Sequence, residues 1–448
     1  MKQSATALKL SLIASYAVMA ILVLVPFNAL LYTWAGSNFR HLDLFRIGKE
    51  LLMLPLGLYA SLIVLNKPTF RQQFANSWLV RCILAYTLLF FVYAAVVLLR
   101  HSVVTSAVLY SLITNLRFIW WLLVVWVISL TNPLLQRQWL KIVLIPASLV
   151  IIFGLLQKFL LPADFLRHFG YGPNTIEAIE TVDQKLDYRR IQSSLRGANP
   201  LGAYLIIVLT TIVAYVRKYW YLWILLAGGI VLLSFTYSRS ALLGLAASLL
   251  FFGWQALPNR LLRRGMLFVA VAGALILGGL TWALRHNSIV ENTVFHSDSS
   301  SQASTSSNAQ RASALKQGWQ DVSGQPLGSG PGTAGPASVR NNGQARLAEN
   351  YFLQIGQEVG WLGVALFVAI NLLVARSLWQ RTTPLARVLL ASLVGITLVN
   401  LLSHAWADDT ISLLWWGLAG IGLSTPVILN SKHEQKTKTN QKTSTRTN

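Results

Sequence analysis

Long apolar runs separated by short polar segments recur along almost the whole chain. A helix that crosses the hydrocarbon core of a bilayer needs about 20 mostly apolar residues. The spacing of the runs predicts an all-α integral membrane protein with one polytopic membrane domain over residues 1–430. About twelve transmembrane helices are expected, at roughly 10–35, 44–66, 78–99, 107–130, 142–161, 200–216, 221–236, 240–257, 266–284, 351–375, 388–405 and 410–429.

Composition supports this class and excludes others. Hydrophobic residues make up 54% of the 448 positions and charged residues only 12%, which is not the balance of a soluble domain. The single cysteine, Cys82, excludes internal disulfides and a cysteine-based metal site. The first apolar stretch, Leu10 to Tyr32, is long enough to stay as an anchor, so we expect no cleaved signal peptide.

The distribution of charge predicts the orientation. The net charge is +22, and a cytoplasmic amino terminus would make every short inner loop basic. Of the 15 acidic residues, only Glu434 would then lie inside, as the positive-inside rule requires. We therefore expect both termini in the cytoplasm and a multi-pass protein of the cytoplasmic (inner) membrane. Residues 431–448 are predicted to be a basic, disordered cytoplasmic tail that rests on anionic lipid.

Two connections between predicted spans are unusually long, and both should be extracytoplasmic. They cover about 162–199 and 285–350, the second just before the tenth span. In the second, residues 311–320 favour a helix, and the Gly/Pro-rich segment 326–333 must be a turn or loop. This connection ends at Glu349, where a polar segment becomes an apolar helix. A charge at such a boundary points to function.

Three arginines are expected on the same side as Glu349. Arg196 stands just before a predicted span, Arg239 lies in a very short connection between two spans, and Arg311 precedes the glycine-rich segment. An arginine at mid-bilayer costs about 3 kcal/mol, so Arg239 needs an anionic partner or a water-filled cavity. Guanidinium groups suit phosphate, and a carboxylate can act as general base on a hydroxyl. Such a set fits transfer from a diphosphate-linked donor without a metal.

Each element has a simpler interpretation. An arginine in an external loop is commonly a solvated charge, and Glu349 is also explained as a carboxylate favoured by a helix N-terminus. The glycine-rich segment is either a plain loop or a source of backbone N–H donors for a phosphate. The residues alone leave these alternatives open.

The motifs match a known family. The chain resembles the O-antigen ligase and O-antigen polymerase superfamily of bacterial envelope glycan enzymes. Ligases of that family carry His-Asn, nine residues, and Gly-x-x-Gly; a Ser-Arg-Gly/Ser-Ala pattern; and an arginine shortly before Asn-Pro. The matching positions are Glu349-Asn350 with Gly360 to Gly363, Ser238 to Ala241, Arg196 with Asn199-Pro200, and Arg311 upstream of the glycine-rich segment.

The resemblance implies a GT-C-type membrane glycosyltransferase with a large extracytoplasmic loop. Such an enzyme moves a glycan from a polyprenyl-diphosphate donor, such as undecaprenyl diphosphate, to an acceptor hydroxyl in cell-surface polysaccharide biosynthesis. The resemblance implies an inverting, metal-independent reaction with no cofactor. It makes Glu349 and Arg239 catalytic and assigns Arg196, Arg239 and Arg311 to the diphosphate.

Glu349 stands where many ligases have histidine. A ligase would pass the glycan to a lipid A core, as in lipopolysaccharide, whereas a polymerase of the same fold joins lipid-linked repeat units. Both remain open, as do the glycan, the acceptor, the presence of an outer membrane and the oligomeric state. The partners expected are the lipid bilayer, the donor and a glycan or glycolipid acceptor, with no nucleic acid.

Other polar residues lie within or beside predicted spans. Asn350, Arg117 and Glu358 are candidates to line a substrate cavity. Arg46 and Glu50, four residues apart, are expected to pair with each other.

Asp408 and Asp409, near His404, form either a solvated turn or a cation site. The turn is the simpler interpretation, and it agrees with a metal-free mechanism.

Two other classes of function fit a twelve-span protein. One is a transporter or lipid-glycan flippase, which commonly has two related halves around a midplane site. Here the halves differ, because the long connections follow the fifth and ninth predicted spans. The other is a non-catalytic member of an envelope glycan assembly.

Overall fold

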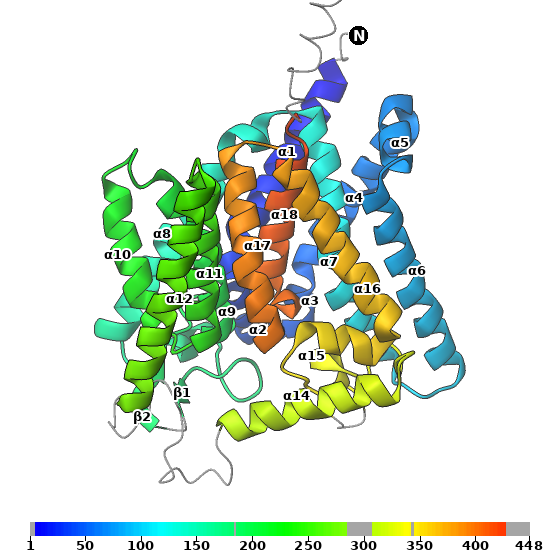
Figure 1. Ribbon diagram of the computed structural model, residues 1–448. Coiled ribbons are helices and arrows are strands. Elements are labelled where there is room, and N and C mark those ends of the chain that lie inside the picture. The colour runs from blue at the N-terminus through cyan, green and yellow to red at the C-terminus, as the bar shows by residue number, and fades with distance from the viewer. Residues whose placement is uncertain (1–4, 183–184, 285–306, 342–344, 427–448) are drawn as a thin grey trace, which may run out of the picture.

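The computed structural model describes residues 5–182, 185–284, 307–341 and 345–426. These residues form a bundle of long helices (Figure 1), and each predicted span coincides with a helix. The helices are α1 and α2 (Ala5–Leu24 and Asn28–Phe39, joined by the 3-10 turn Val25–Phe27), α4 (Gly48–Asn66), α6 (Trp78–Leu99), α7 (Thr105–Thr131), α8 (Leu134–Phe159), α9 (Ala198–Tyr215), α10 (Tyr221–Ser234), α11 (Arg239–Ala256), α12 (Arg260–Ala283), α16 (Tyr351–Trp379), α17 (Pro384–Leu402) and α18 (Asp409–Leu423).

Nine helices in the described part of the chain are long and apolar enough to cross a membrane, which confirms an all-α integral membrane protein. The prediction was too long for α10 and α18. Their 14 and 15 residues rise about 21 Å and 23 Å, short of a hydrocarbon core of about 30 Å. Every residue of α18 from Thr410 to Leu423 is buried, so this helix packs against other helices rather than against lipid.

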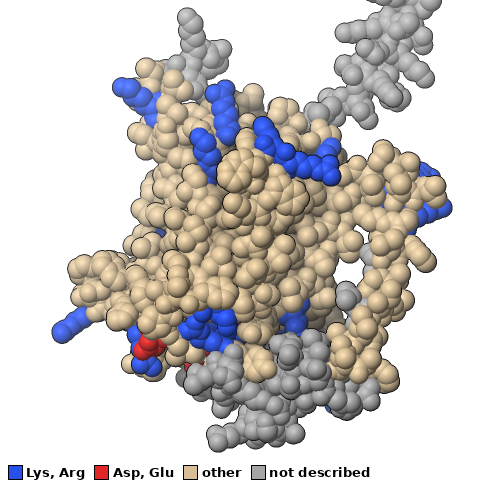
Figure 2. Space-filling view, turned by 90° about the vertical axis from the view of Figure 1, so that its left-hand side faces the viewer, with Lys and Arg blue, Asp and Glu red and all other residues tan. Residues whose placement is uncertain are grey.

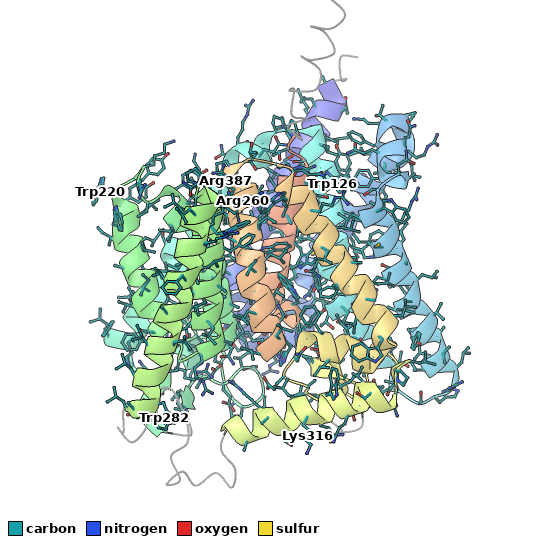
Figure 3. The ribbon with its side chains drawn as sticks, in the orientation of Figure 1. Trp126, Trp220, Arg260, Trp282, Lys316 and Arg387 are labelled. Carbon is teal, nitrogen blue, oxygen red and sulfur yellow. The ribbon has the colours of Figure 1, made fainter. Side chains whose placement is uncertain are left out.

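The two ends of the bundle differ. Short helix α5 (Pro68–Ala75) and the amino-terminal start of α1 lie at one end, the top of Figure 1. Arg260 and Arg387 lie toward this end in Figure 3, and we call it the basic end. Lys316 lies at the opposite end. In Figure 2, a broad band of uncharged residues separates blue groups near the top from those below.

The opposite end, here called the α14 end, carries the long connections. It holds α14 (Ser307–Gly324), the short α15 (Gly335–Ser338), and the antiparallel strands β1 (Glu180–Val182) and β2 (Lys185–Arg190) (Figure 1). The helix predicted at 311–320 is therefore present and longer. The hairpin was not predicted, and its register pairs Glu180 with Arg190. Residues 285–306 of the second connection and the predicted tail 431–448 lie outside the described residues.

Helix α16 is broken nine residues after it begins. Val359 and Gly360 leave the helical conformation, and Gly360 has φ 70° and ψ −173°. A Cβ at Gly360 would lie 2.4 Å from the carbonyl oxygen of Pro326, so only glycine fits. The first glycine of the Gly-x-x-Gly motif therefore ends the first part of α16.

The glycine-rich segment 326–333 fills this break. The Ser329 and Gly330 N–H groups donate to the carbonyls of Gln357 and Glu358 at 2.7 and 2.8 Å, and the Trp361 N–H donates to Pro326 at 3.0 Å. The Ser329 and Gly330 N–H groups satisfy the backbone carbonyls that the break in α16 leaves without helical partners. Backbone polar groups inside a membrane need such hydrogen bonds. The hypothesis that the N–H groups of this segment surround a phosphate is therefore wrong for Ser329 and Gly330.

Candidate functional site

A cavity of about 260 Å³ opens at the α14 end, between the start of α9, the entrance of α16 and the connection from α17 to α18. We call it the central cavity. Its charged and ionisable lining groups are Glu180, Arg196, Glu349, His404 and Asp408. Three separate connections thus meet here, each just before or after a membrane helix.

Glu349 is held at the cavity by local backbone geometry. Its φ is 50°, in the left-handed region that few non-glycine residues adopt. The next residue, Asn350, caps α16 because its side-chain oxygen accepts from the Phe352 and Leu353 N–H groups at 2.9 and 3.0 Å. The Asn350 amide also donates to the Leu401 carbonyl at 3.0 Å. Asn350 is thus an anchor beside the cavity and is not among its lining residues.

His404 comes from the far end of the chain to the same place as Glu349. The Tyr351 N–H donates to the Ser403 carbonyl at 3.2 Å, which ties the two connections together. Burial lowers the pKa of His404, while the negative charge of Glu349 opposes that shift. Among the described residues, neither side chain makes a hydrogen bond or an ion pair with another residue. A neutral imidazole and a carboxylate therefore face the cavity with their polar atoms available.

Arg196 lines the central cavity and a second one. The second cavity has a volume of about 350 Å³, and Arg196 and Asp408 belong to the lining of both. No carboxylate in the described part of the chain lies within ion-pair distance of Arg196. Its guanidinium is thus placed at the junction of the two cavities.

Arg239 and Arg311 do not line either cavity. Arg239 is the first residue of α11. Arg190 connects this region to the central cavity: its guanidinium donates to the Thr236 carbonyl at 2.9 Å and to the Asn199 side chain at 2.6 Å. Burial lowers the pKa of Arg190; the negative charge of Glu180 opposes that shift, and the positive charge of Arg311 adds to it, so Arg311 lies near Arg190.

Arg190 was not among the predicted site residues. Glu180 lies 3.9 Å from it, across the unpredicted hairpin. We call Arg190, Arg239 and Arg311 the hairpin-side arginines. They come from β2, α11 and α14, and Arg190 contacts Asn199, which lines the central cavity.

Arg117 forms ion pairs with Glu50 of α4 and Asp409 of α18, and it lines the second cavity. Lys49 pairs with the same two carboxylates at 3.2 and 2.7 Å. The predicted Arg46–Glu50 pair is wrong, because the short helix α3 (Leu42–Arg46) ends before α4 begins and the two side chains do not share a helix face. Arg46 instead donates to the Tyr110 hydroxyl at 3.2 Å.

The Asp408–Asp409 pair behaves as a helix start. The Asp408 side chain accepts from the Thr410 and Ile411 N–H groups at 2.9 and 3.4 Å, and Asp409 is held by Lys49 and Arg117. Among the described residues, no group of three or more metal-ligating side chains occurs here. Neither carboxylate is the freely solvated group that the turn interpretation assumed, because Asp408 caps α18 and Asp409 is paired with two cations.

Glu358 is fully buried in the first part of α16, and it does not line either cavity. Its carboxylate accepts from the Ser111 hydroxyl at 2.9 Å, the Asn115 amide at 2.8 Å and the Gly332 N–H at 2.9 Å. It therefore fastens the glycine-rich segment to α7, rather than facing substrate.

Fold and site define a multi-pass, all-α membrane protein whose charged cavity lies beside a broken helix. Residues 224–368 match the family model described as O-antigen ligase. This match over residues 224–368 supports the resemblance to the O-antigen ligase and polymerase superfamily that the motifs predicted. The matched region holds Arg239, Arg311, Glu349 and the break at Gly360, whereas Arg196 and His404 lie outside it. No curated protein matches the chain.

Members of this family are glycosyltransferase-like ligases or polymerases in polysaccharide biosynthesis. Sequence reasoning missed His404 and Arg190, and it also missed Arg340, which lines the second cavity. One feature of the sequence could have indicated His404, because it lies in a predicted external turn near Asp408. Nothing in the sequence relates His404 to Glu349.

Proposed function

We propose that this protein transfers a glycan from a polyprenyl-diphosphate donor to an acceptor hydroxyl, in the central cavity. The observation that supports this best is the meeting of Glu349, His404 and Arg196 in one cavity of a chain that matches the O-antigen ligase family model. A base and a cation side by side are what the reaction needs, because a proton must leave the acceptor while negative charge develops on the departing diphosphate.

In the proposed step, the acceptor hydroxyl gives its proton to the Glu349 carboxylate. The acceptor oxygen then forms a bond to the anomeric carbon of the donor sugar. The bond from that carbon to the diphosphate oxygen breaks, and its electron pair leaves with the diphosphate. Attack opposite the leaving group inverts the configuration. His404, neutral because burial lowers its pKa, is placed to relay the proton from Glu349.

Arg196 and the hairpin-side arginines are proposed to hold the donor diphosphate. Arg239 is the first residue of α11, and Arg311 of α14 lies near enough to Arg190 for its charge to lower the pKa of Arg190. Guanidinium groups bind phosphate oxygens bidentately and keep their charge at any physiological pH. In this proposal the leaving group is stabilised by arginines alone.

The proposed orientation places the basic end in the cytoplasm and the α14 end outside. The positive-inside rule supports it, because Arg260 and Arg387 lie toward the basic end. The reaction would then occur on the outer face of the cytoplasmic membrane.

The test is transfer in proteoliposomes with a lipid-diphosphate glycan donor. Glu349→Gln should lower the transfer rate about 10²- to 10⁴-fold, the usual contribution of a general base. Arg239→Ala should abolish transfer with normal membrane insertion. The matched control is Asp164→Asn, since Asp164 pairs with Arg167 on the surface, away from the cavity.

Full activity of Glu349→Gln would exclude this mechanism. Movement of the lipid-linked glycan between leaflets without a new glycosidic bond would favour the flippase alternative. The ligase and polymerase alternatives differ in the acceptor.

A further inference from the structure

The second part of α16, from Gly360 to Trp379, has a tryptophan at each end. Trp361 and Trp379 are separated by about five helical turns, so both side chains lie on the same face of the helix. They are 41% and 53% exposed, and the exposed Leu372 lies between them on that face. This pattern is typical of a helix that faces lipid, because indole rings favour the two membrane–water interfaces.

The spacing of the two tryptophans matches the thickness of a bilayer. The helix rises about 27 Å from Trp361 to Trp379, close to a hydrocarbon core of about 30 Å. Helix α17 follows after the turn at the basic end and has 19 residues, which rise about 28 Å before it ends at Leu402. Both lengths place the far boundary of the hydrocarbon at the break in α16 and at the end of α17.

A second exposed tryptophan meets Trp361 from α14. The ring centroids of Trp319 and Trp361 are 5.8 Å apart in an edge-to-face arrangement, and Trp319 is 58% exposed. Leu327 of the glycine-rich segment is 74% exposed, and the Trp361 N–H donates to the carbonyl of the preceding residue, Pro326. We call Trp319, Leu327 and Trp361 the outer patch. Three separate elements thus bring large apolar side chains to the same boundary.

Helix α14 lies across the ends of the long helices rather than alongside them (Figure 1). It is not apolar enough to cross a membrane itself. Gln317 and Asp321 stand two positions to either side of Trp319, which places them on the opposite face of α14. They are hydrogen-bonded to each other at 2.9 Å, and Asp321 pairs with Arg346 at 2.7 Å. A helix with one polar face and a tryptophan on the other suits the surface of a membrane.

We propose that the outer patch is seated in the lipid headgroup region of the leaflet at the α14 end, so that α14 rests on the membrane surface. The partner is the bilayer, because Trp361 belongs both to the patch and to the exposed face of α16. Glu349 precedes the first part of α16, and His404 follows the end of α17. The central cavity therefore opens at the level of the headgroups, outside the hydrocarbon.

The depth of the patch is measured with a spin label on purified protein in nanodiscs of phosphatidylcholine and phosphatidylglycerol. Cys82→Ala removes the single cysteine, and Leu327→Cys then carries the nitroxide. The label should collide more with oxygen, which is enriched in lipid, than with a water-soluble nickel chelate. Leu372→Cys, in the middle of the exposed face, gives the reading for a deep position.

Lys316→Cys is the matched control on α14, because Lys316 is exposed and lies outside the patch. Its label should collide mainly with the nickel chelate. If the label at position 327 behaves like the one at position 316, the patch lies in water and the proposal is overturned.

A charge in the patch should move it toward water. Trp319→Glu should raise nickel collisions of the label at position 327 several-fold, whereas Trp319→Phe should stay close to the parent protein. Lys316→Glu adds the same charge elsewhere on the helix and should change nothing. Because Trp319 is mostly exposed, these variants should fold normally. An unchanged collision ratio in Trp319→Glu would show that this tryptophan is not seated in the membrane.

Other occupants of the patch would give different signals. A second copy of the chain would bring two labels together and broaden the spectrum, and a contact with protein would shield the label from both reagents. Either result would overturn the assignment to lipid. These measurements do not depend on glycan transfer, so the proposed function is tested separately.

Discussion

Glu349 stands just before the cap of α16 and Glu358 near the end of its first part, yet their surroundings are opposite. Glu358 is fully buried and accepts hydrogen bonds from Ser111, Asn115 and Gly332. Glu349 lines a cavity, and within the described residues its carboxylate makes no hydrogen bond or ion pair. Both are carboxylates within or beside a membrane helix, so that position does not by itself identify a reacting group.

The difference lies in what each carboxylate is bonded to. A buried carboxylate whose oxygens are all satisfied fixes the structure around it, because removing it leaves several donors without partners. A carboxylate without protein partners, facing a cavity beside a histidine and an arginine, has its oxygens available for substrate. Glu358 therefore positions the glycine-rich segment, and Glu349 is the candidate base.

The largest effect should come from Glu358→Ala. The variant leaves the Ser111, Asn115 and Gly332 donors unsatisfied, at about 1–3 kcal/mol for each buried group. Thermal unfolding in detergent should occur at a clearly lower temperature, and transfer should be lost. Glu349→Ala should lose transfer and keep its unfolding temperature. Glu358→Gln, which retains one acceptor oxygen, should lie between wild type and Glu358→Ala. An unchanged unfolding temperature for Glu358→Ala would contradict the structural role that distinguishes Glu358 from Glu349.

Gly360→Ala should have a smaller effect on transfer and on the unfolding temperature. Gly360 forms the break in α16 that follows Glu358. The left-handed conformation at this position costs about 1–3 kcal/mol for a residue with a Cβ, and the Cβ would press on the Pro326 carbonyl. We expect partial loss of transfer and a lower unfolding temperature, measured as above. Gly279→Ala in α12 is the control, since no atom lies within 4 Å of its added Cβ. If both glycine variants behave like wild type, the break does not position the site.

The smallest effect concerns pH. Burial, then the charge of Asp409, raises the pKa of Asp408 to about 6, against the opposing effect of Arg196. Asp408 is therefore mostly neutral below pH 6 and anionic above it. Its negative charge near Arg196 should compete with a diphosphate, so KM for the donor should rise several-fold from pH 5 to pH 7.

Asp408→Asn keeps the capping oxygen of α18 and removes the charge, so its donor KM should vary less with pH. An equally steep rise in the variant would show that another group is responsible. His404→Gln serves as the comparison, because His404 also lines the cavity.

The sequence by itself determined the helical membrane class and the approximate position of each helix, and its motifs predicted the family that the match over residues 224–368 supports. Hydropathy is summed over neighbouring residues, and the spacing from Glu349 to Gly360 is a local property of the chain. The same local reasoning placed Arg196 and Glu349 at helix starts, where the structure finds them beside one cavity. It failed at Arg46 and Glu50, because it extended one helix across the break at Ile47.

Only the tertiary structure decided which charges are partnered. Arg117 is matched with Glu50 and Asp409 from two other helices, while Arg46 and Arg340 meet across Tyr110. His404 reaches Glu349 through the connection that follows α17, and Gly332 reaches Glu358 through a break in α16. These partners are far apart in the sequence, so no local sequence pattern predicts their contacts. In a medium of low polarity, those long-range pairings determine whether a charged group stabilises the fold or remains available for substrate.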